Sequence, residues 1–337
     1  MAIGIMLPRN ISAANVINFA RRAEELGFDE VWVVEDLGFR GGIAQTAAVL
    51  ASTKRIRVGI GILPAGARNA AFDAMELATL EQLYPGRIDA GIGHGMPGWM
   101  RSVGAWPKSP LGLLRDHVNV VRGLISGRGV DVPAALISED PAAVRLDVTA
   151  IPTHVPDLLL GVRGPKSLEL SGRVAEGTVL AEPVTPEYAR AALASIEAGR
   201  AAWAGSADTL VAGVLAPKDK PHRVVAYNFG AVADTDEQAI ERIRPTLAGL
   251  AGPDWAPHIA PLPFAQEFYA LFEQCSSPEE FARRVPGEWV LALSLSGTVE
   301  RVRARIAELE GAGVTSNVFV PMQADAMDAL EELAQVL

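Results

Sequence analysis

The chain has 337 residues, a formal net charge of −10 at pH 7, 49% hydrophobic residues and a single cysteine. This length accommodates two domains or one α/β barrel, with a core that needs no disulfide or metal. The acidic surplus argues against a nucleic-acid partner, because phosphate backbones select Lys and Arg. Cys275 excludes an intrachain disulfide, and the five scattered histidines show no metal-ligand spacing.

Secretion and membrane insertion are also not expected. Residues 1–8 lack the basic stretch of a signal peptide and are interrupted by Pro8. No apolar run approaches the ~20 residues that span a bilayer. The sequence therefore predicts a cytoplasmic, acidic α/β protein.

Short β-branched runs alternate with amphipathic stretches along the chain, which predicts alternating strands and helices. The predicted strands are residues 2–7, 30–34, 56–62, 87–92, 158–162, 178–181, 224–232 and 314–320. The predicted helices are residues 12–27, 43–52, 70–84, 111–126, 165–174, 186–203, 299–309 and 322–337. Residues 144–151 are expected to form a small hairpin, and residues 235–284 a broken helical stretch.

Eight strands that alternate with helices predict a (β/α)8 TIM barrel. We expect one domain over residues 1–337, with a loop-rich insertion at about 127–156 and a helical insertion at about 235–297. The alternative is an open doubly wound sheet, which usually carries a glycine fingerprint after its first strand. The corresponding loop, residues 7–12, contains no glycine, and this favours the barrel.

Carboxylates follow two of the predicted strands. A barrel builds its site on the loops after the C-terminal strand ends, so side chains there are candidates for ligand contact. Glu35 and Asp36 follow the second strand, and Glu182 follows the sixth. The pair is a candidate ligand anchor or proton donor; the alternative is a helix cap or an ion pair with Arg40.

Glycines mark the ends of the third and fourth strands. Gly59 and Gly61 indicate either close approach of a ligand to the backbone or tight packing between barrel layers. Residues 93–98 match Gly-x-Gly-x-x-Gly, but Pro97 interrupts the match and no helix is expected there, so we reject a dinucleotide site. The segment still suits a planar ligand, with His94 as a candidate donor or as a loop histidine with a local hydrogen bond.

The end of the fifth strand predicts an anion site. Gly164 is expected at a helix cap with Pro165 at the first helical position, followed by free backbone N–H groups. Lys166, Ser167 and Arg163 add two cations and a hydroxyl beside the positive end of the helix dipole. The alternative is an ordinary glycine–proline helix start.

Taken together, these segments resemble the bacterial luciferase-like flavin and deazaflavin oxidoreductases. The residues that carry the resemblance are 27–36, 57–64, 84–87, 91–95 and 161–167. The sequence is most similar to the branch that uses the deazaflavin coenzyme F420, including methylenetetrahydromethanopterin reductase-like proteins. The resemblance implies a TIM barrel with an insertion, a homodimer, and a non-proline cis peptide between Gly61 and Ile62.

The resemblance also assigns site residues. It places the cofactor's phosphate on Gly161, Val162, Gly164, Pro165, Lys166 and Ser167. It places Glu35, Gly61, Ile62, Gly93 and Gly95 around the rest of the cofactor. Glu182, selected by its position after the sixth strand, is a further candidate for cofactor binding. Asp36 stands at the position near the reacting carbon that is often a histidine, and His94 lies in the turn after the fourth strand.

Two departures narrow the expected reaction. Members that oxidise sugar phosphates carry a histidine and a glutamate where this chain has Asp36 and Met96, so glucose-6-phosphate oxidation is not expected. Luciferase has a reactive cysteine near its site, whereas Cys275 lies far from the strand ends in sequence, so light emission is not expected either.

The leading hypothesis is an oxidoreductase that moves a hydride between F420 and a small organic substrate, with Asp36 or His94 exchanging a proton. The first alternative is an FMN-dependent monooxygenase, because an FMN phosphate suits the same helix terminus. The second is a flavin- or deazaflavin-binding protein without turnover. A barrel lyase or aldolase needs a Schiff-base lysine; Lys166 is the only candidate at a strand end, and its position at a helix start suits a phosphate better.

Overall fold

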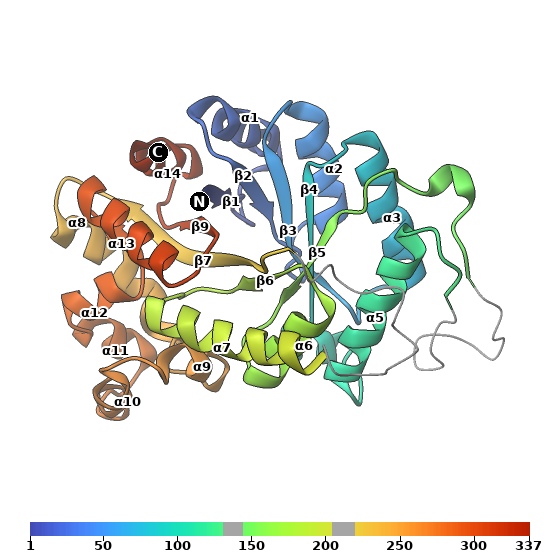
Figure 1. Cartoon of the computed structure of the whole chain (residues 1–337). Helices are drawn as coiled ribbons and strands as arrows, with labels where there is room; N and C mark the ends of the chain where they lie inside the picture. The colour runs from blue at the N-terminus through green and yellow to red at the C-terminus, as the bar shows by residue number, and fades with distance from the viewer. Residues whose placement is uncertain (131–143, 204–219) are drawn as a thin grey trace. The chain divides into compact units, whose positions relative to one another are not determined.

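A computed structural model describes residues 1–130, 144–203 and 220–337 (Figure 1). These residues form two compact units whose segments alternate along the chain. Unit 1 comprises Met1–Glu30, Leu180–Ala194 and Val224–Leu337, and unit 2 comprises Val31–Val179 and Ser195–Arg223. The predicted single domain over the whole chain stays a prediction.

Unit 2 is built on neighbouring parallel strands. They are β2 (Glu30–Val33), β3 (Arg57–Pro64), β4 (Ile88–Gly93), β5 (Asp157–Gly161) and β6 (Gly177–Leu180). Strand β4 pairs with β3 on one side and β5 on the other, and β5 pairs with β6. Every residue of β2, β4 and β6 is buried, as expected for parallel strands covered by helices.

The helices of unit 2 follow its strands in sequence. They are α2 (Gly42–Ser52), α3 (Ala70–Leu83), α4 (Pro97–Ser102), α5 (Pro110–Ile125), α6 (Pro165–Val174) and a short 3-10 helix, η2 (Val148–Ala150). The Asn69 side chain caps α3 by accepting from the Ala71 N–H. Helix α7 (Pro186–Trp203) begins in unit 1 and ends in unit 2.

Unit 1 contains a second set of parallel strands in the order β1-β9-β7-β8. They are β1 (Ala2–Met6), β7 (Arg223–Val232), β8 (Leu295–Gly297) and β9 (Ser316–Pro321). Its helices are η1 (Ala13–Asn15), α1 (Val16–Leu26), α8 (Asp236–Ile243), η3 (Arg244–Gly249), η4 (Pro253–Trp255), α9 (Ala256–Ile259), α10 (Ala265–Glu273), α11 (Pro278–Arg284), α12 (Gly287–Ala292), α13 (Val299–Gly311), α14 (Ala326–Leu333) and η5 (Ala334–Val336).

Aromatic packing explains why the predicted broken helical stretch folds as several short helices. Helices α9 to α12 lie together in Figure 1. Phe268 of α10 meets Phe281 of α11 edge to face, with ring centroids 4.9 Å apart. Phe264 stacks on Trp289 of α12, also at 4.9 Å and with ring planes 7° apart. These rings form a local core for the helices that follow β7.

The predicted alternation of strands and helices, and with it the (β/α)8 class, is confirmed. All eight predicted strands are present with ends within two residues, but β8 was not predicted. The predicted hairpin is wrong for residues 144–151, since Val144 forms a single antiparallel bridge with Val130 and residues 148–150 form η2. The middle of that predicted insertion lies outside the described residues.

Two helix starts also differ from the prediction. Helix α4 begins at Pro97, where no helix was expected, because a proline suits the first helical position. Helix α4 has only six residues, and Gly98 lies inside it. The Gly-x-Gly-x-x-Gly segment is therefore not followed by the long helix that a dinucleotide site requires. Ser12 precedes the 3-10 helix η1 without a side-chain cap bond, whereas Gly27 ends α1 with φ +101°. Among the described residues, no helix is long and apolar enough to cross a membrane.

Candidate functional site

The C-terminal ends of β3, β4 and β5 lie side by side in unit 2. Pro64 of β3 pairs with Gly93 of β4, which in turn pairs with Gly161 of β5. Three of the segments that the sequence analysis selected therefore meet at one edge of the parallel sheet. This is the edge at which barrels of this class carry their sites.

Ile62 explains the glycines at this edge. The Gly61–Ile62 peptide is cis, as the resemblance implied, and the β3–β4 register shifts between Ile60 and Leu63. A β-carbon at Gly161 would lie 2.3 Å from Ile62 Cγ2, and one at Gly93 would lie 2.6 Å from the Gly161 carbonyl oxygen and 3.0 Å from Ile62 Cδ1. The Ile62 side chain thus occupies the space that the two neighbouring strands leave open.

Gly59 has a different neighbour. A β-carbon there would lie 2.2 Å from the Trp32 ring, which is fully buried. Of the two interpretations of this glycine, tight packing between neighbouring strands therefore applies. Gly59 is a core position rather than a ligand contact.

Glu35 is held by a cation that the sequence analysis missed. Its Oε1 accepts from Arg68 Nη1 at 2.8 Å, and its Oε2 accepts from Arg68 Nη2 at 3.0 Å. Oε2 also accepts from the Gly42 N–H at 2.6 Å, at the start of α2. Glu35 therefore acts as a cap for α2 and as one half of a bidentate ion pair. Asp36 is half-buried, and its carbonyl accepts from the Phe39 N–H in a tight turn.

The ion pair continues into the interior of unit 2. Arg68 Nε lies 3.4 Å from Asp73 Oδ1 and 3.8 Å from Glu76 Oε2. Asp73 Oδ2 lies 2.8 Å from His117 Nε2, and both of these side chains are fully buried. Burial and the neighbouring carboxylates of Asp73 and Glu35 raise the pKa of Glu76. The positive charge of Arg68 lowers this pKa, but it offsets the increase only in part. One guanidinium thus serves three carboxylates.

His94 contacts the predicted anion site. Its Nε2 lies 3.2 Å from Ser167 Oγ. Burial lowers the pKa of His94, and the nearby backbone carbonyl of Pro110 offsets this only in part. The structure thus joins two residues for which the sequence predicted separate roles.

Helix α6 offers fewer free amides than predicted. Gly164 is the cap and Pro165 is the first helical residue, as expected. The N–H groups of Ser167 and Leu168 both donate to the Gly164 carbonyl, at 3.0 and 2.9 Å. Within the described part of the chain, the donors left at this end include the Lys166 N–H and the exposed Lys166 ammonium, whereas the Ser167 hydroxyl already shares a hydrogen bond with His94. Val162 is buried, directly before this turn.

Glu182 belongs to unit 1, whereas the other predicted site residues belong to unit 2. The Glu182–Pro183 peptide is cis. The Glu182 carbonyl accepts from Trp255 Nε1 at 3.0 Å, and the Pro183 carbonyl lies 3.0 Å from His258 Nδ1. The helical stretch after β7 therefore fixes the loop that follows β6, and no sequence pattern linked these two segments.

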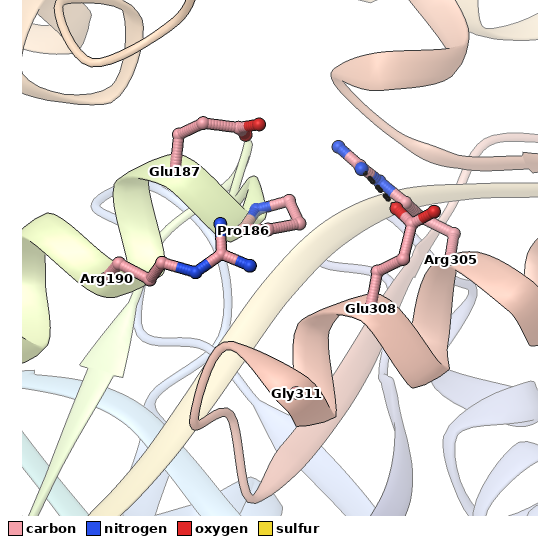
Figure 2. Close-up of a pocket in the computed structure, with 6 residues that line it drawn as sticks. All are labelled: Pro186, Glu187, Arg190, Arg305, Glu308 and Gly311. Atoms are coloured by element: carbon pink, nitrogen blue, oxygen red, sulfur yellow. Dashed lines mark hydrogen bonds and ion pairs between the residues drawn. The ribbon is translucent and has the colours of Figure 1, made fainter.

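A groove of about 360 Å³ lies elsewhere in unit 1 (Figure 2). Pro186, Glu187 and Arg190 of α7 and Arg305, Glu308 and Gly311 of α13 line it. Arg305 is already held by Glu308 at 2.7 Å and by the Ala292 carbonyl at 2.6 Å. None of the predicted site residues lines this groove, and the described residues contain no group of three or more side chains that could hold a metal ion.

Residues 1–316 match the family described as luciferase-like monooxygenase. The chain belongs to this family. A relative of this luciferase-like protein, the 5,10-methylenetetrahydromethanopterin reductase of Methanolobus tindarius, is 27% identical over 199 residues, which are 59% of each chain. The enzyme of that name from Archaeoglobus fulgidus is 24% identical over 336 residues, covering 94% of this chain and 92% of the relative.

The fold of this luciferase-like protein matches a solved structure over its whole length. The coenzyme F420-dependent tetrahydromethanopterin reductase of Methanopyrus kandleri gives a TM-score of 0.78 at 20% identity, covering 100% of this chain and 98% of that chain. The predicted TIM-barrel fold is confirmed, as are the predicted family and the prediction of an enzyme of that family.

Proposed function

We propose that this luciferase-like protein is an oxidoreductase that transfers a hydride between coenzyme F420 and a small organic substrate. The observation that carries the proposal is the meeting of the β3, β4 and β5 ends with the start of α6 in unit 2. The two relatives above are methylenetetrahydromethanopterin reductases, and the solved structure is described as F420-dependent. These likenesses favour F420 over FMN.

The residues at the start of α6 fit a phosphate group. The Lys166 ammonium is exposed, the Ser167 hydroxyl lies beside it, and the positive end of a ten-residue helix adds to both. The segment from Gly161 to Ser167 would therefore hold the cofactor's phosphate. When bound, the deazaflavin supplies or accepts the hydride, while the protein orients it.

The strand ends would shape the rest of the cofactor site. The half-buried Gly61–Ile62 segment would face the ring, with Gly93 and Gly95 beside it. Glu35 is held in place by two hydrogen bonds from Arg68, so it would present a rigid acceptor to a polar edge. We assign the proton exchange with substrate to Asp36, which follows Glu35 and is half-buried.

Titration of the purified protein with F420 and, separately, with FMN tests this function, with intrinsic tryptophan fluorescence as the readout. We expect F420 to bind and Lys166→Ala to weaken that binding about tenfold or more, because a charge-assisted contact to phosphate is lost. Lys54→Ala is the matched control, since Lys54 is exposed and precedes β3 at its opposite end. It should bind as the wild type does.

Other outcomes would overturn the proposal in distinct ways. A preference for FMN would favour the monooxygenase. Binding of F420 without any hydride transfer across a panel of carbonyl and alcohol substrates would favour a binding protein without turnover. Binding of neither cofactor would show that the barrel is retained without a cofactor site. The predicted cytoplasmic location stays a prediction.

We also infer that the protein forms a homodimer through α3. Phe72, Met75 and Leu83 are 63%, 49% and 64% exposed. At 100° per residue, these positions fall on one side of α3, where Thr79 lies between Met75 and Leu83, so they form a mainly apolar stripe along the helix. In a dimer with two-fold symmetry both subunits contribute the same surface, so the α3 stripe of one subunit would be buried against the α3 stripe of the other.

A further inference from the structure

Exposed apolar side chains gather at the edge of unit 2 that carries the candidate site. Outside α3, the exposed large apolar side chains among the described residues of unit 2 are those of Leu37, Phe39, Val103 and Val148. The first two follow β2, and Val103 follows β4 and α4; all three are about half exposed. We call Leu37, Phe39 and Val103 the apolar rim. One exposed apolar residue is ordinary, but three beside neighbouring strand ends indicate a binding surface.

The turn at residues 36–39, which carries two members of the apolar rim, is held in place. The Phe39 N–H donates to the Asp36 carbonyl at 3.0 Å, and Gly38 has φ +90°, as the third residue of a type II turn requires. Gln45 Nε2 donates to one backbone carbonyl before the turn and one after it, at 3.1 and 3.2 Å. The exposure of these apolar side chains is therefore a property of an ordered turn.

The loop after β3 joins the segments that carry the apolar rim. Arg68, in that loop, holds Glu35 beside the turn. In the same loop, a β-carbon at Gly66 would lie 2.5 Å from the Ala105 carbonyl oxygen and 3.1 Å from Met100 Cε, so α4 and the residues after it pack against this loop. The segments that follow β2, β3 and β4 are therefore in contact with one another, and the apolar rim lies on them.

Two cations of these connected segments are already engaged. Arg68 is bound to Glu35, and the Arg101 guanidinium lies 5.2 Å from the centroid of the Trp106 ring. Neither of them requires an anionic ligand. An uncharged hydrocarbon group suits the apolar rim, because it leaves water without displacing an ion pair.

Asp36 connects the apolar rim with the proposed chemistry. It is the first residue of the turn, and it is the residue to which we assign the proton exchange. A β-turn keeps the α-carbons of its first and fourth residues within about 7 Å of each other. A substrate whose reacting carbon lies at Asp36 therefore has the apolar rim beside the part of the molecule that follows this carbon.

We propose that the substrate carries an uncharged hydrocarbon arm next to its reacting carbon, and that Leu37, Phe39 and Val103 bind this arm. The inference rests on the proposed function, since it places the reacting carbon at Asp36. It names a substrate class, namely ketones or alcohols with a chain of several carbon atoms. The apolar rim selects the substrate and takes no part in the chemical step.

Calorimetric titration with butan-2-one, hexan-2-one and octan-2-one tests this inference. The titrations are run with and without oxidised F420, which has no hydride to give, so binding is measured without turnover. We expect the dissociation constant of the wild type to fall about two- to fourfold for each added methylene group, because each one is removed from water.

Two variants and a control locate the arm. In Leu37→Ser combined with Phe39→Ser, we expect octan-2-one to bind about tenfold or more weakly, whereas butan-2-one and F420 should bind as to the wild type. Val103→Ser should weaken octan-2-one about threefold. The replaced side chains are about half exposed, so folding should be retained.

Val148→Ser is the matched control. Val148 is 79% exposed on η2, and the Thr149 carbonyl beside it accepts from Gln82, shortly before β4 begins. This residue therefore lies toward the starts of the strands, away from the candidate site. Its variant should keep the chain-length dependence of the wild type.

The outcomes distinguish this inference from the proposed function. Hydride transfer with F420 but no dependence of ketone binding on chain length would overturn the inference and leave the function standing. A dependence that persists in the rim variants would place the arm elsewhere and would also overturn it. Loss of a dimer in the double variant, measured by light scattering, would assign the rim to a second copy of the chain instead. A dependence that the variants lose, without any F420 binding, would support the apolar site and overturn the function.

Discussion

The guanidinium of Arg68 holds two loops of unit 2 together. It bridges Glu35, after β2, to the segment between β3 and α3. Burial by itself lowers the pKa of Arg68, but its bonds to Glu35 and the charges of Asp73 and Glu76 raise it above the ordinary value. The cation therefore persists at every physiological pH and neutralises carboxylates that include the fully buried Asp73.

Removing this cation should destabilise the protein at neutral pH. Arg68→Met leaves Glu35 and Asp73 without their cation, and we expect a loss of about 2–4 kcal/mol in the free energy of unfolding. The loss should shrink as the pH falls, because Glu76, whose pKa is raised by burial, takes up a proton and then no longer needs the cation. Urea unfolding at several pH values measures it.

Arg22→Met is the matched control for this experiment. Arg22 also forms a bidentate ion pair, in which its Nε and Nη2 donate to Glu331 Oε1 and Oε2 at 2.5 and 3.0 Å. The two side chains, however, are 40% and 46% exposed. Water already solvates these charges, so the control should lose far less stability than Arg68→Met. Similar losses for the two variants would contradict a structural role for the buried network.

The Arg68 network shows where sequence reasoning stops at this scale. The position of Glu35 after a strand was visible, but its partner is 33 residues away on another loop. Likewise, Ser167 and His94 were each identified from the sequence, but the two hydrogen-bonded residues are 73 positions apart in the chain. Local patterns predict which residues reach a strand end, and only the packed fold determines which of them touch.

At the scale of elements, the predictable strands were those with long β-branched runs between turn residues. Strand β8 escaped prediction because it has three residues and ends at Gly297, whose φ is +126°. Helix α14 begins four residues later than expected, because Asp325 caps it by accepting from the Met327 and Asp328 N–H groups. Short elements carry too few residues for a periodic pattern.

A chain of hydroxyls and an imidazole connects α6 and β6 with the residue before β7. Ser171 Oγ donates to the Gly177 carbonyl, so Thr178 Oγ1, 2.7 Å away, must donate to Ser171. His222 Nε2, 2.8 Å from Thr178 Oγ1, must then be the donor of that bond. This tautomer explains why Nδ1, buried without a partner among the described residues, is the unprotonated nitrogen.

The buried imidazole should make stability depend on pH. Burial, aided by the charge of Arg200, lowers the pKa of His222 to about 4. The unfolded chain binds the proton near pH 6.5 and the folded chain does not, so stability is full above about 6.5 and falls as the pH drops toward about 4. The loss should reach about 3 kcal/mol in the free energy of unfolding.

Urea unfolding of His222→Asn between about pH 7.5 and 4 tests this dependence. Asparagine has no titratable side chain, so the part of the pH dependence of stability that is due to residue 222 should disappear. An unchanged slope in His222→Asn would assign the acid sensitivity to the carboxylates instead.

At the scale of the whole molecule, the exposed apolar side chains are informative because several of them share one helix. Large apolar side chains that are scattered singly on a surface need no explanation, but a stripe along α3 does. Composition and charge predicted the absence of a nucleic-acid partner, and periodicity predicted α3. Neither composition nor periodicity could predict the stripe. Apolar residues lie on both the buried and the exposed side of α3, so its sequence has no amphipathic pattern that would distinguish the two sides.

The α3 stripe leads to a prediction about assembly. Phe72→Glu combined with Leu83→Glu places carboxylates in the stripe that a two-fold axis brings against the same stripe of the second copy, so charge repulsion and the loss of apolar area both weaken the contact. We expect the wild type to have twice the mass of one chain by light scattering. The double variant should have the mass of one chain, with a dissociation constant raised about a hundredfold or more. Leu337→Glu, at an exposed apolar residue of unit 1, whereas α3 belongs to unit 2, should leave the dimer intact. A dimer that survives the double variant would place the interface on another face, whereas a monomeric wild type would show that the stripe is exposed for another purpose.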